Sequence, residues 1–326
     1  MTGAADAWLP APTVGPKASG VTTTTTTTAT TRQTLVGSSY LVGAALLWGV
    51  GFYAQRVSVE ETSPLWSVAL RFGLAVPLAV GALLHRRKAG VRIPWRAGAL
   101  LGLLLYVIFA LQTVAMVHTP VTRVALITGL YAVFVPLLQP LFRLPRPGAL
   151  QLLAVFVALV GLVLLCGVVG DERALSVPPN IGDVYTLGMA VVSAVMVLLI
   201  GHYAPREDPV ALNVVQILVM AGCAVVVAPL FEGSPPADVG ARTMASLVYL
   251  AVCSTFLAFL FQMLGQRHVS PSTASILMLL ETPIGVFAAV AILNERMAGV
   301  QWVGAALALI AVVCAVAAER AKVAGS

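Results

Sequence analysis

Charged residues are scarce in this chain. Only 10% of its 326 residues are Asp, Glu, Lys or Arg, whereas 59% are hydrophobic and the mean hydropathy is +0.96. Soluble domains carry about 25% charged residues. This chain therefore has too little charge to cover a water-facing surface, and the composition predicts that lipid is its main solvent.

The motifs of several enzyme and binding classes are also missing. The sequence has no G-x-x-x-x-G-K-[ST] loop, which excludes that cradle for ATP. The four cysteines lie in apolar runs without a C-x-x-C pair, so we expect them to fill space. The four histidines lie near segment ends without metal-ligand spacing. We therefore expect no catalytic residues, no metal and no cofactor.

The net charge of +6 and the pI of 9.4 do not indicate a nucleic-acid partner. The basic residues are scattered over short connectors and form no patch with interleaved aromatic residues. Basic cytoplasmic loops of a membrane protein produce the same net charge. The sequence therefore predicts a lipid bilayer and a small solute as its partners, and it leaves the oligomeric state open.

The first 34 residues differ in kind from the rest. They contain Pro10, Pro12 and Pro16 and an unbroken threonine run from Thr22 to Thr28. Such a composition builds no core, so we predict a disordered cytoplasmic tail. The stretch lacks the charged start, apolar middle and cleavage site of a signal peptide. The first membrane helix is therefore expected to direct insertion.

Ten apolar segments of membrane-spanning length follow the tail. Unpaired backbone groups are costly in hydrocarbon, and the segments lack the strict alternation of barrel strands, so we expect helices. The predicted fold class is an all-α membrane protein with ten transmembrane helices. The segments are 36–55, 65–84, 97–117, 121–142, 149–169, 181–203, 210–231, 244–266, 271–293 and 299–318.

Two stretches of the chain align without a gap. Residues 122–161 run in step with residues 272–311, with apolar blocks and connectors in the same places, and Pro64 pairs with Pro209. Internal duplication of apolar segments is typical of solute transporters. Because each half holds an odd number of helices, the second half enters the membrane inverted, and a polar cavity is expected between the halves near mid-bilayer.

The duplication defines the predicted domains. They are a tail (1–34), a first repeat of helices 1–5 (35–170), a second repeat of helices 6–10 (180–318) and a cytoplasmic tail (319–326). With the tail inside, most basic residues fall on inner connectors, the run His85–Lys88 above all. Both termini are therefore predicted to be cytoplasmic. The Arg-, Ala-, Val-, Leu- and Gly-rich usage favours a bacterial inner membrane.

Several motifs resemble the EamA-type transporters of the drug/metabolite transporter superfamily. They are ALLWGVGFYAQR (45–56), SPLWSVALRF (63–72), GDVYTLGMAVVSA (182–194) and the long run 270–313. The resemblance covers about residues 37–318. It implies a ten-helix bundle of two EamA-like repeats with cytoplasmic ends. It also implies movement of small metabolites, often export of amino acids or related compounds, without nucleotide hydrolysis.

The chain departs from one related group. The small multidrug pumps, which resemble this family, rely on a membrane-embedded glutamate in the first helix. Segment 36–55 holds Trp48, Tyr53 and Gln55 but no acid, and Glu60 and Glu61 follow its outer end. A pump for lipophilic cations working by that mechanism is therefore not expected.

Two ionisable residues lie inside apolar segments. Glu281 is about halfway along segment 271–293, and Arg71 is a third of the way into segment 65–84. Ionisable groups in hydrocarbon are costly and usually face a cavity or a partner. In one interpretation Arg71 attracts an anionic group such as a carboxylate, and Glu281 takes an amine or a proton. In the other, they pair with each other or with backbone as a structural lock.

Helix-breaking residues cluster in two matching segments. Gly129 and Pro136 interrupt one, and Pro283 and Gly285 interrupt its counterpart. Interrupted helices at corresponding positions of two repeats indicate a binding site, although a packing kink is the alternative. Tyr131 occupies the position that matches Glu281. The polar or aromatic residues predicted to line the site with Glu281 and Arg71 are Tyr131, Trp48, Gln112 and Tyr53.

These observations favour a secondary transporter of small polar metabolites that exposes a central site alternately to each face. A membrane-embedded transferase would need acid, histidine or metal-ligand clusters near an interface. A receptor or scaffold without transport is the third class, against which the duplication and the central charges argue. The sequence favours neither import nor export.

Overall fold

The fold is described from a computed structural model, which places residues 31–119, 121–166, 178–293 and 298–324. In these ranges the chain is helical with short turns and contains no strand. The predicted tail 1–34 lies largely outside them, but residues 31–34 already form the first turn of a helix. Residues 319–324, assigned to the second tail, likewise continue a helix.

The first repeat contains six α-helices and one 3-10 helix. They are α1 (Thr31–Glu61), α2 (Pro64–Lys88), α3 (Trp95–His118), α4 (Val121–Thr128), α5 (Tyr131–Leu138), η1 (Gln139–Phe142) and α6 (Ala149–Leu165). The helix α1 is longer than the predicted segment 36–55, and Glu60 and Glu61 belong to its last turn. Because α4, α5 and η1 follow one another along a single path, the repeat spans the membrane five times.

The second repeat follows the same plan. Its elements are α8 (Ile181–Tyr203), α9 (Pro209–Glu232), α10 (Ala241–Tyr249), η2 (Leu250–Leu257), α11 (Ala258–Gln266), α12 (Pro271–Met278), α13 (Glu281–Leu293) and α14 (Gly299–Ala324). The helices α10, η2 and α11 form one span, and α12 and α13 form another. Within the described ranges, nine spans are long and apolar enough to cross a membrane, and α6 is a shorter apolar helix of 17 residues.

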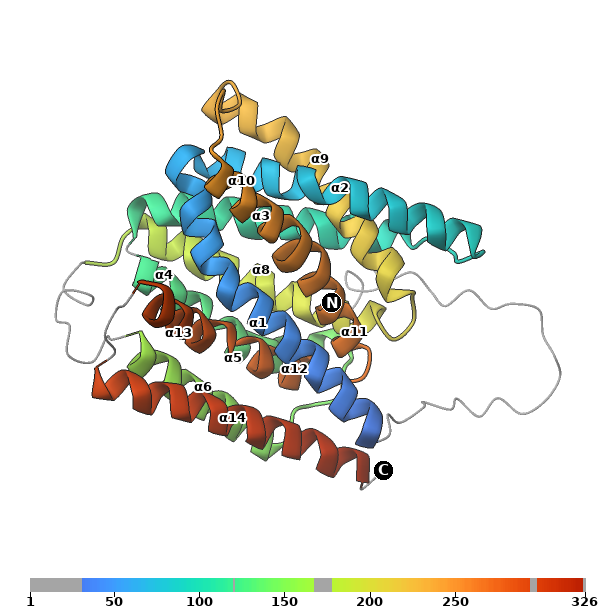
Figure 1. The fold of residues 1–326 in the computed structure, drawn as a ribbon. Helices are drawn as coiled ribbons and strands as arrows, with labels where there is room; N and C mark the ends of the chain where they lie inside the picture. Colours follow the sequence, from blue (N-terminus) through green and yellow to red (C-terminus); the bar gives the residue numbers. More distant parts are fainter. Residues whose placement is uncertain (1–30, 120, 167–177, 294–297, 325–326) are drawn as a thin grey trace, which may run out of the picture.

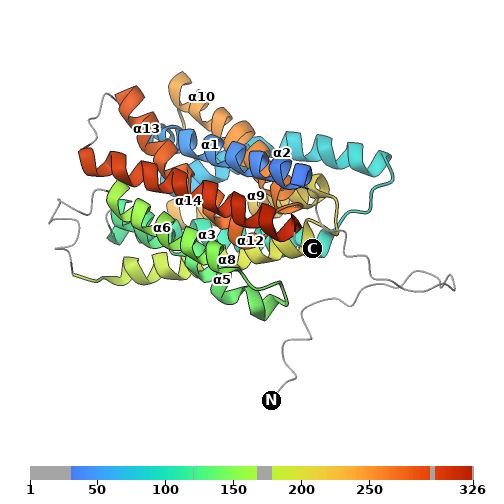
Figure 2. The same cartoon turned by 90° about the horizontal axis from the view of Figure 1, so that it is seen from below.

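The two repeats are inverted relative to each other. Equivalent helices pair across the interface, since α2 packs on α9 and α6 packs on α14. The packing of α3 on α8 has its counterpart in the packing of α10 and α11 on α1. Figures 1 and 2 show α6 beside α14 in both views, with the start of α1 and the end of α14 at the same end of the bundle. The fold is therefore a ten-helix bundle of two inverted five-helix repeats, as predicted.

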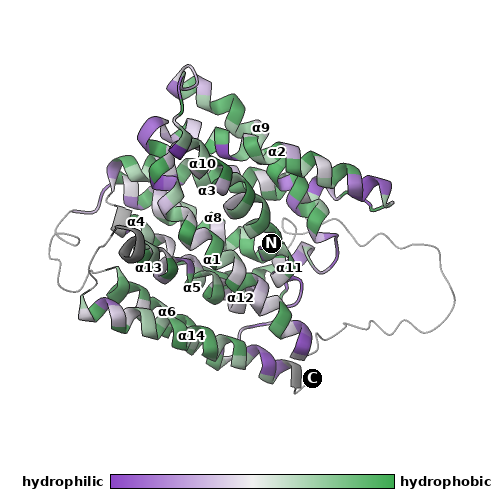
Figure 3. Cartoon of the chain, viewed as in Figure 1, coloured by the Kyte–Doolittle hydropathy of each residue, from purple (hydrophilic) through white to green (hydrophobic). Residues whose placement is uncertain are grey.

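The face that carries the start of α1 and the end of α14 is called the terminal face here, and the other is called the opposite face. Hydrophilic residues gather at the ends of the bundle and apolar residues lie between them (Figure 3). Large apolar side chains such as Phe156 and Val313 are exposed on the described surface. At the terminal end of α2, Arg87 lies 5.5 Å from the ring centre of Trp95. This distribution is that of a helical bundle surrounded by lipid.

A carboxylate from a second helix caps one helix start on each face. On the opposite face, Glu232 accepts hydrogen bonds from the N–H groups of Leu65 (3.0 Å) and Trp66 (3.0 Å) and from the Ser63 hydroxyl. On the terminal face, Glu319 accepts from the Ser270 N–H (3.1 Å) and the Thr273 hydroxyl (2.7 Å). The positive end of a helix dipole favours such an anion. The starts of α2 and α12 are thereby fastened to the ends of α9 and α14.

Candidate functional site

Two spans are interrupted near their centres at equivalent positions. The α4 helix ends at Thr128 and α5 begins at Tyr131, whereas α12 ends at Met278 and α13 begins at Glu281. At both places a backbone hydrogen bond joins residues three apart instead of four. The Leu130 N–H donates to Ile127 O (3.1 Å), and the Leu280 N–H donates to Leu277 O (3.2 Å). Both interruptions are therefore tight turns of 3-10 type, in which the backbone stays paired.

The breaker residues lie at or near these turns. Gly129 lies in the first turn, and Pro283 is the third residue of α13. Proline has no N–H to offer Leu279 O, and the Thr282 N–H donates to that oxygen instead, at 3.2 Å. The sequence placed the second interruption at Pro283, but the turn falls just before it, where proline fits a first helical turn. Pro136 and Gly285 lie within α5 and α13 and interrupt neither helix.

Tyr131 and Glu281 are the first residues of the two half-helices that leave these turns. Tyr131 is buried, and its hydroxyl donates to Ser275 O of α12 at 3.2 Å. Glu281 is half-buried and lies within electrostatic range of the Tyr131 hydroxyl. Among the described residues, the Glu281 carboxylate has neither a hydrogen-bond partner nor an ion-pair partner. The two turns thus place a tyrosine and an unpaired carboxylate at the interface of the repeats.

The helix α1 passes close to the second turn. A methyl group added at Gly49 would lie 2.9 Å from Glu281 O and 2.5 Å from Ile284 Cγ2. Glycine is required at such an approach because any side chain would push the helices apart. The preceding residue, Trp48, lies at the same level of α1. This contact brings the Trp48 region of α1 to the start of α13.

Arg71 is buried on α2 and binds the π-helical segment η2. Its Nε donates to Thr255 Oγ1 at 2.6 Å, and one terminal nitrogen donates to Ser254 O and Oγ at 3.1 Å. The guanidinium also lies 5.3 Å from the ring centre of Phe109. Trp48 Nε1 donates to the same Ser254 oxygen, at 2.9 Å. Arg71 and Trp48 therefore converge on one carbonyl of a helix with widened turns.

No carboxylate of the described chain pairs with Arg71. Its hydrogen-bond partners are neutral oxygens. Of the predicted alternative, the ion pair with Glu281 is not formed among the described residues, whereas the bond to backbone is formed, since Arg71 donates to Ser254 O. A buried cation without a counter-ion has a high desolvation cost and attracts an anion. Arg71 and Glu281 are thus a cation and a carboxylate without counter-ions among the described residues, and α1 contacts both α2 and α13, which carry them.

Comparison with known proteins agrees with this architecture. The profile of the EamA-like transporter family matches residues 35–167 and 180–317, which together make up most of the chain. The chain belongs to the EamA-like transporter family. This family is part of the drug/metabolite transporter superfamily, as the sequence motifs indicated. The protein is therefore a membrane transporter.

Two further similarities support the assignment. An uncharacterized transporter of Archaeoglobus fulgidus is 27% identical over 280 residues, which cover 82% of this chain and 82% of that protein. A solved protein crystal structure superposes with a TM-score of 0.73 over 88% of this chain and 97% of the other, at 20% identity. At 20% identity, this superposition shows a similarity of fold alone.

The remaining predicted site residues of this EamA-like transporter, Tyr53 and Gln112, form no hydrogen bond with Arg71 or Glu281 in the described chain. Tyr53 is half-buried near the opposite face, where its hydroxyl accepts a hydrogen bond from Arg242 at 3.2 Å. Gln112 is half-buried on α3. The structure thus brings Trp48 and Arg71 together at η2 and Tyr131 and Glu281 at the helix turns, but it does not join Tyr53 to either group.

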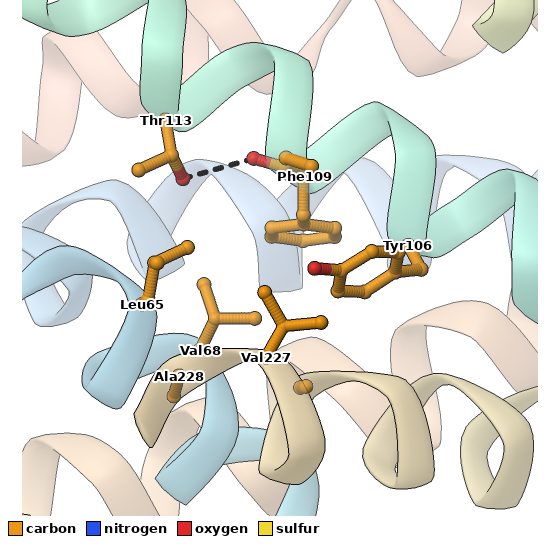
Figure 4. Close-up of a pocket in the computed structure, with 9 residues that line it drawn as sticks. Leu65, Val68, Tyr106, Phe109, Thr113, Val227 and Ala228 are labelled. Atoms are coloured by element: carbon orange, nitrogen blue, oxygen red, sulfur yellow. Dashed lines mark hydrogen bonds between the residues drawn. The ribbon is translucent and has the colours of Figure 1, made fainter. Parts of the chain in front are cut away.

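Two cavities are apolar rather than polar. One lies among α2, α3 and α9, where Leu65, Val68 and Phe109 line it and the Tyr106 hydroxyl points into it (Figure 4). The other lies beside the second turn and is lined by Leu279, Leu280, Pro283 and residues of α6 and α14. Neither is lined by Arg71 or Glu281. Neither cavity is therefore the polar cavity that the sequence predicted, and the Arg71 guanidinium is bonded to Ser254 and Thr255 of η2 instead.

Sequence reasoning missed the partners of Arg71. Ser254 and Thr255 lie in an ordinary apolar run, and nothing in that run marks the π-helical turns. It also assigned Glu319 to a tail, although this residue is buried in the cap of α12. A signal for the cap was present in the sequence, since Ser-Pro starts both α2 and α12. Among the described residues, no three of His, Cys, Asp and Glu are grouped to hold a metal.

Proposed function

We propose that this protein is a secondary transporter that moves small polar metabolites, amino acids or related compounds, without nucleotide hydrolysis. The observation that carries the proposal is the pair of equivalent helix turns, with Tyr131 and an unpaired Glu281 at their starts. In transporters with inverted repeats, half-helix ends near mid-bilayer bind substrate groups. The site alternates in its access between the two faces as the repeats rock against each other.

The uncompensated charges favour a zwitterionic solute. Arg71 offers a guanidinium for a carboxylate, and Glu281 offers a carboxylate for an amine or a proton. Tyr131 and Trp48, which already donate to backbone oxygens beside these charges, hold the surrounding helices in place. Gln112 and Tyr53 belong to the walls of the path. We assign export as the direction, as the family resemblance implies.

The charge distribution supports the proposed orientation in a bacterial inner membrane. The terminal face carries the basic run His85–Lys88 at the end of α2, and the opposite face carries Glu60, Glu61 and Glu232. Basic residues favour the cytoplasmic side. The proposed orientation therefore has both ends of the chain in the cytoplasm. A phosphatase or fluorescent-protein fusion at the C-terminus reports this side directly, and activity of a periplasmic reporter would refute the orientation.

Transport itself is tested with purified protein in liposomes. Pooled labelled amino acids, sugars and cations are offered to the vesicles, and accumulation or efflux is measured against protein-free liposomes. The expected result is flux of zwitterionic solutes. Flux confined to sugars or lipophilic cations, or no flux with folded protein, would contradict the proposed solute class.

Glu281→Gln is expected to lower the flux of the identified solute by about 30-fold or more, because a hydrogen bond to a charged group contributes about 1.5–3 kcal/mol. Glutamine keeps the shape of the side chain but removes its charge. The measurement is the initial rate in liposomes over a range of pH. Glu60→Gln, an exposed carboxylate on α1, serves as the control and should transport normally. Wild-type rates for Glu281→Gln at every pH would remove Glu281 from the site.

A further inference from the structure

Buried side-chain amides with unpaired polar atoms gather in the half of the bundle next to the terminal face. Gln216 on α9 is fully buried, and neither its amide nitrogen nor its amide oxygen has a hydrogen-bond partner among the described residues. The side-chain oxygens of Asn213, Gln262 and Gln266 are buried and unpaired in the same way. These four residues are called the amide cluster.

The amide cluster lies where α9 meets α11. The two helices are in contact, and Leu212, Met220, Phe259 and Met263 from both of them share one apolar core. Asn213 and Gln216 are three residues apart, and Gln262 and Gln266 are four apart, so each pair shares one helix face. Asn213 Nδ2 donates to Phe256 O at 3.1 Å, which ties α9 to η2, and Gln266 Nε2 donates to Val197 O of α8 at 2.8 Å. The cluster therefore lies around the contact of α9 with α11, and its unpaired atoms are the side-chain oxygens and the Gln216 nitrogen.

The start of α1 carries the same feature. The hydroxyls of Thr34 and Ser38 are buried and unpaired, and α1 packs along α11. Most buried unpaired side-chain atoms of the described chain thus lie on α1, α9 and α11 near the terminal face. Buried polar groups are normally paired, because an unmet donor or acceptor is expensive away from water. Their concentration in one region indicates that these atoms find partners in another state of the protein.

The equivalent position in the first repeat is occupied by a polar side chain that is hydrogen-bonded. Gln216 follows Pro209 by seven residues, as Arg71 follows Pro64 by seven. Arg71, the equivalent residue, has three acceptor atoms on η2, whereas Gln216 has none. The backbone at Gln216 packs tightly on α3, where a methyl group at Gly102 would lie 2.7 Å from Gln216 O. The two positions are therefore equivalent in the repeats, but only the Arg71 side chain has hydrogen-bond partners in this conformation.

We propose that the amide cluster forms the terminal-face half of the solute path, which is closed in this structure. When α11 and α1 move away from α9, water and the uncharged polar part of the solute bind the amides, which both donate and accept. This inference rests on the proposed transport function, because it assigns solute contacts on the path. The specificity-determining residues are Gln216, Gln262 and Asn213.

The test is cysteine accessibility in the full chain. The four native cysteines are replaced by alanine, and Gln216→Cys or Gln262→Cys is added. A membrane-impermeant maleimide is applied to vesicles from either face. Labelling from the terminal face is expected to be about tenfold or more faster than for Ala311→Cys, a fully buried control on α14, because only the path opens to water. Rates equal to that control would overturn the proposal.

Thermal stability gives a second, independent readout. Gln216→Leu is expected to raise Tm by about 2–4 °C, because it removes an unpaired amide from the closed state. The same change should slow maleimide labelling at Gln262→Cys, since the closed state becomes favoured. A lower Tm with unchanged labelling would identify Gln216 as a structural residue and refute the inference. Neither measurement uses a transported solute, so failure here is distinct from absence of flux in liposomes.

Discussion

Arg71→Met is expected to reduce the transport of anionic and zwitterionic solutes by about 100-fold, which corresponds to the loss of about 2.7 kcal/mol of charge-assisted binding. The guanidinium is buried beside Ser254 and Thr255 with no carboxylate partner in the described chain. It is therefore free to form an ion pair with a solute once η2 gives way. Methionine removes that pair but keeps the contact with the Phe109 ring through its thioether.

The fold is expected to survive this change. Replacing a buried charge by an apolar side chain of similar length is often neutral for stability, because the desolvation cost disappears. The measurements are solute binding and Tm on the same detergent-purified protein. Arg71→Lys keeps the charge without the planar fork and should retain part of the binding. Arg96→Gln, exposed at the start of α3, is the control.

The opposite outcome has a clear meaning. If Arg71→Met protein unfolds while the folded remainder transports normally, Arg71 acts only as a clamp between α2 and η2. That result would confirm the alternative in which buried charges lock the bundle, and it would move the carboxylate-binding role to another residue.

Gly304→Ala is expected to lower Tm by about 10 °C, because the two last helices of the repeats touch through their backbones. A methyl group at Gly304 would lie 2.5 Å from Leu165 N and 2.6 Å from Gly161 O. Backbone atoms cannot move aside as a side chain would, so α14 must separate from α6 along its length. The measurement is thermal unfolding in detergent, with the expression level as a second readout.

A matched glycine provides the control for this prediction. Nothing lies within 4 Å of the position that a methyl group would take at Gly81 on α2. Gly81→Ala should therefore leave Tm unchanged or raise it, since alanine is about 1 kcal/mol better than glycine in a helix. Equal effects of the two substitutions would show that α6 and α14 do not approach as closely as described.

The fold was largely predictable from the sequence because a lipid environment leaves few backbone structures possible. Apolar runs of about 20 residues become helices wherever backbone groups must pair internally. The register of residues 122–161 with 272–311 then fixed the inverted repeat, and the two helix turns lie at equivalent places in it. Helix ends were less predictable, because α1 and α14 continue past the apolar core into the aqueous layers.

The candidate site was predictable only in part. Composition drew attention to Arg71 and Glu281, since charge inside an apolar run is costly. Composition gave no means of finding Ser254, because no Gly, Pro or charged residue in 250–257 marks the widened turns of η2, which packs against α1 and α2. Tyr53 stays a predicted wall residue of the path. Nothing in the sequence indicates that the length of α1 carries its hydroxyl to Arg242, near the opposite face.

The two carboxylate caps make each face of the bundle separately observable. The amide protons of Leu65 and Trp66 are sequestered by Glu232 on one side, and that of Ser270 is sequestered by Glu319 on the other. Exchange of these protons with deuterated solvent depends on release of the local cap alone. Deuterium uptake by peptides containing either helix start therefore reports loosening on that side of the bilayer, without a covalently attached reporter or a known cargo.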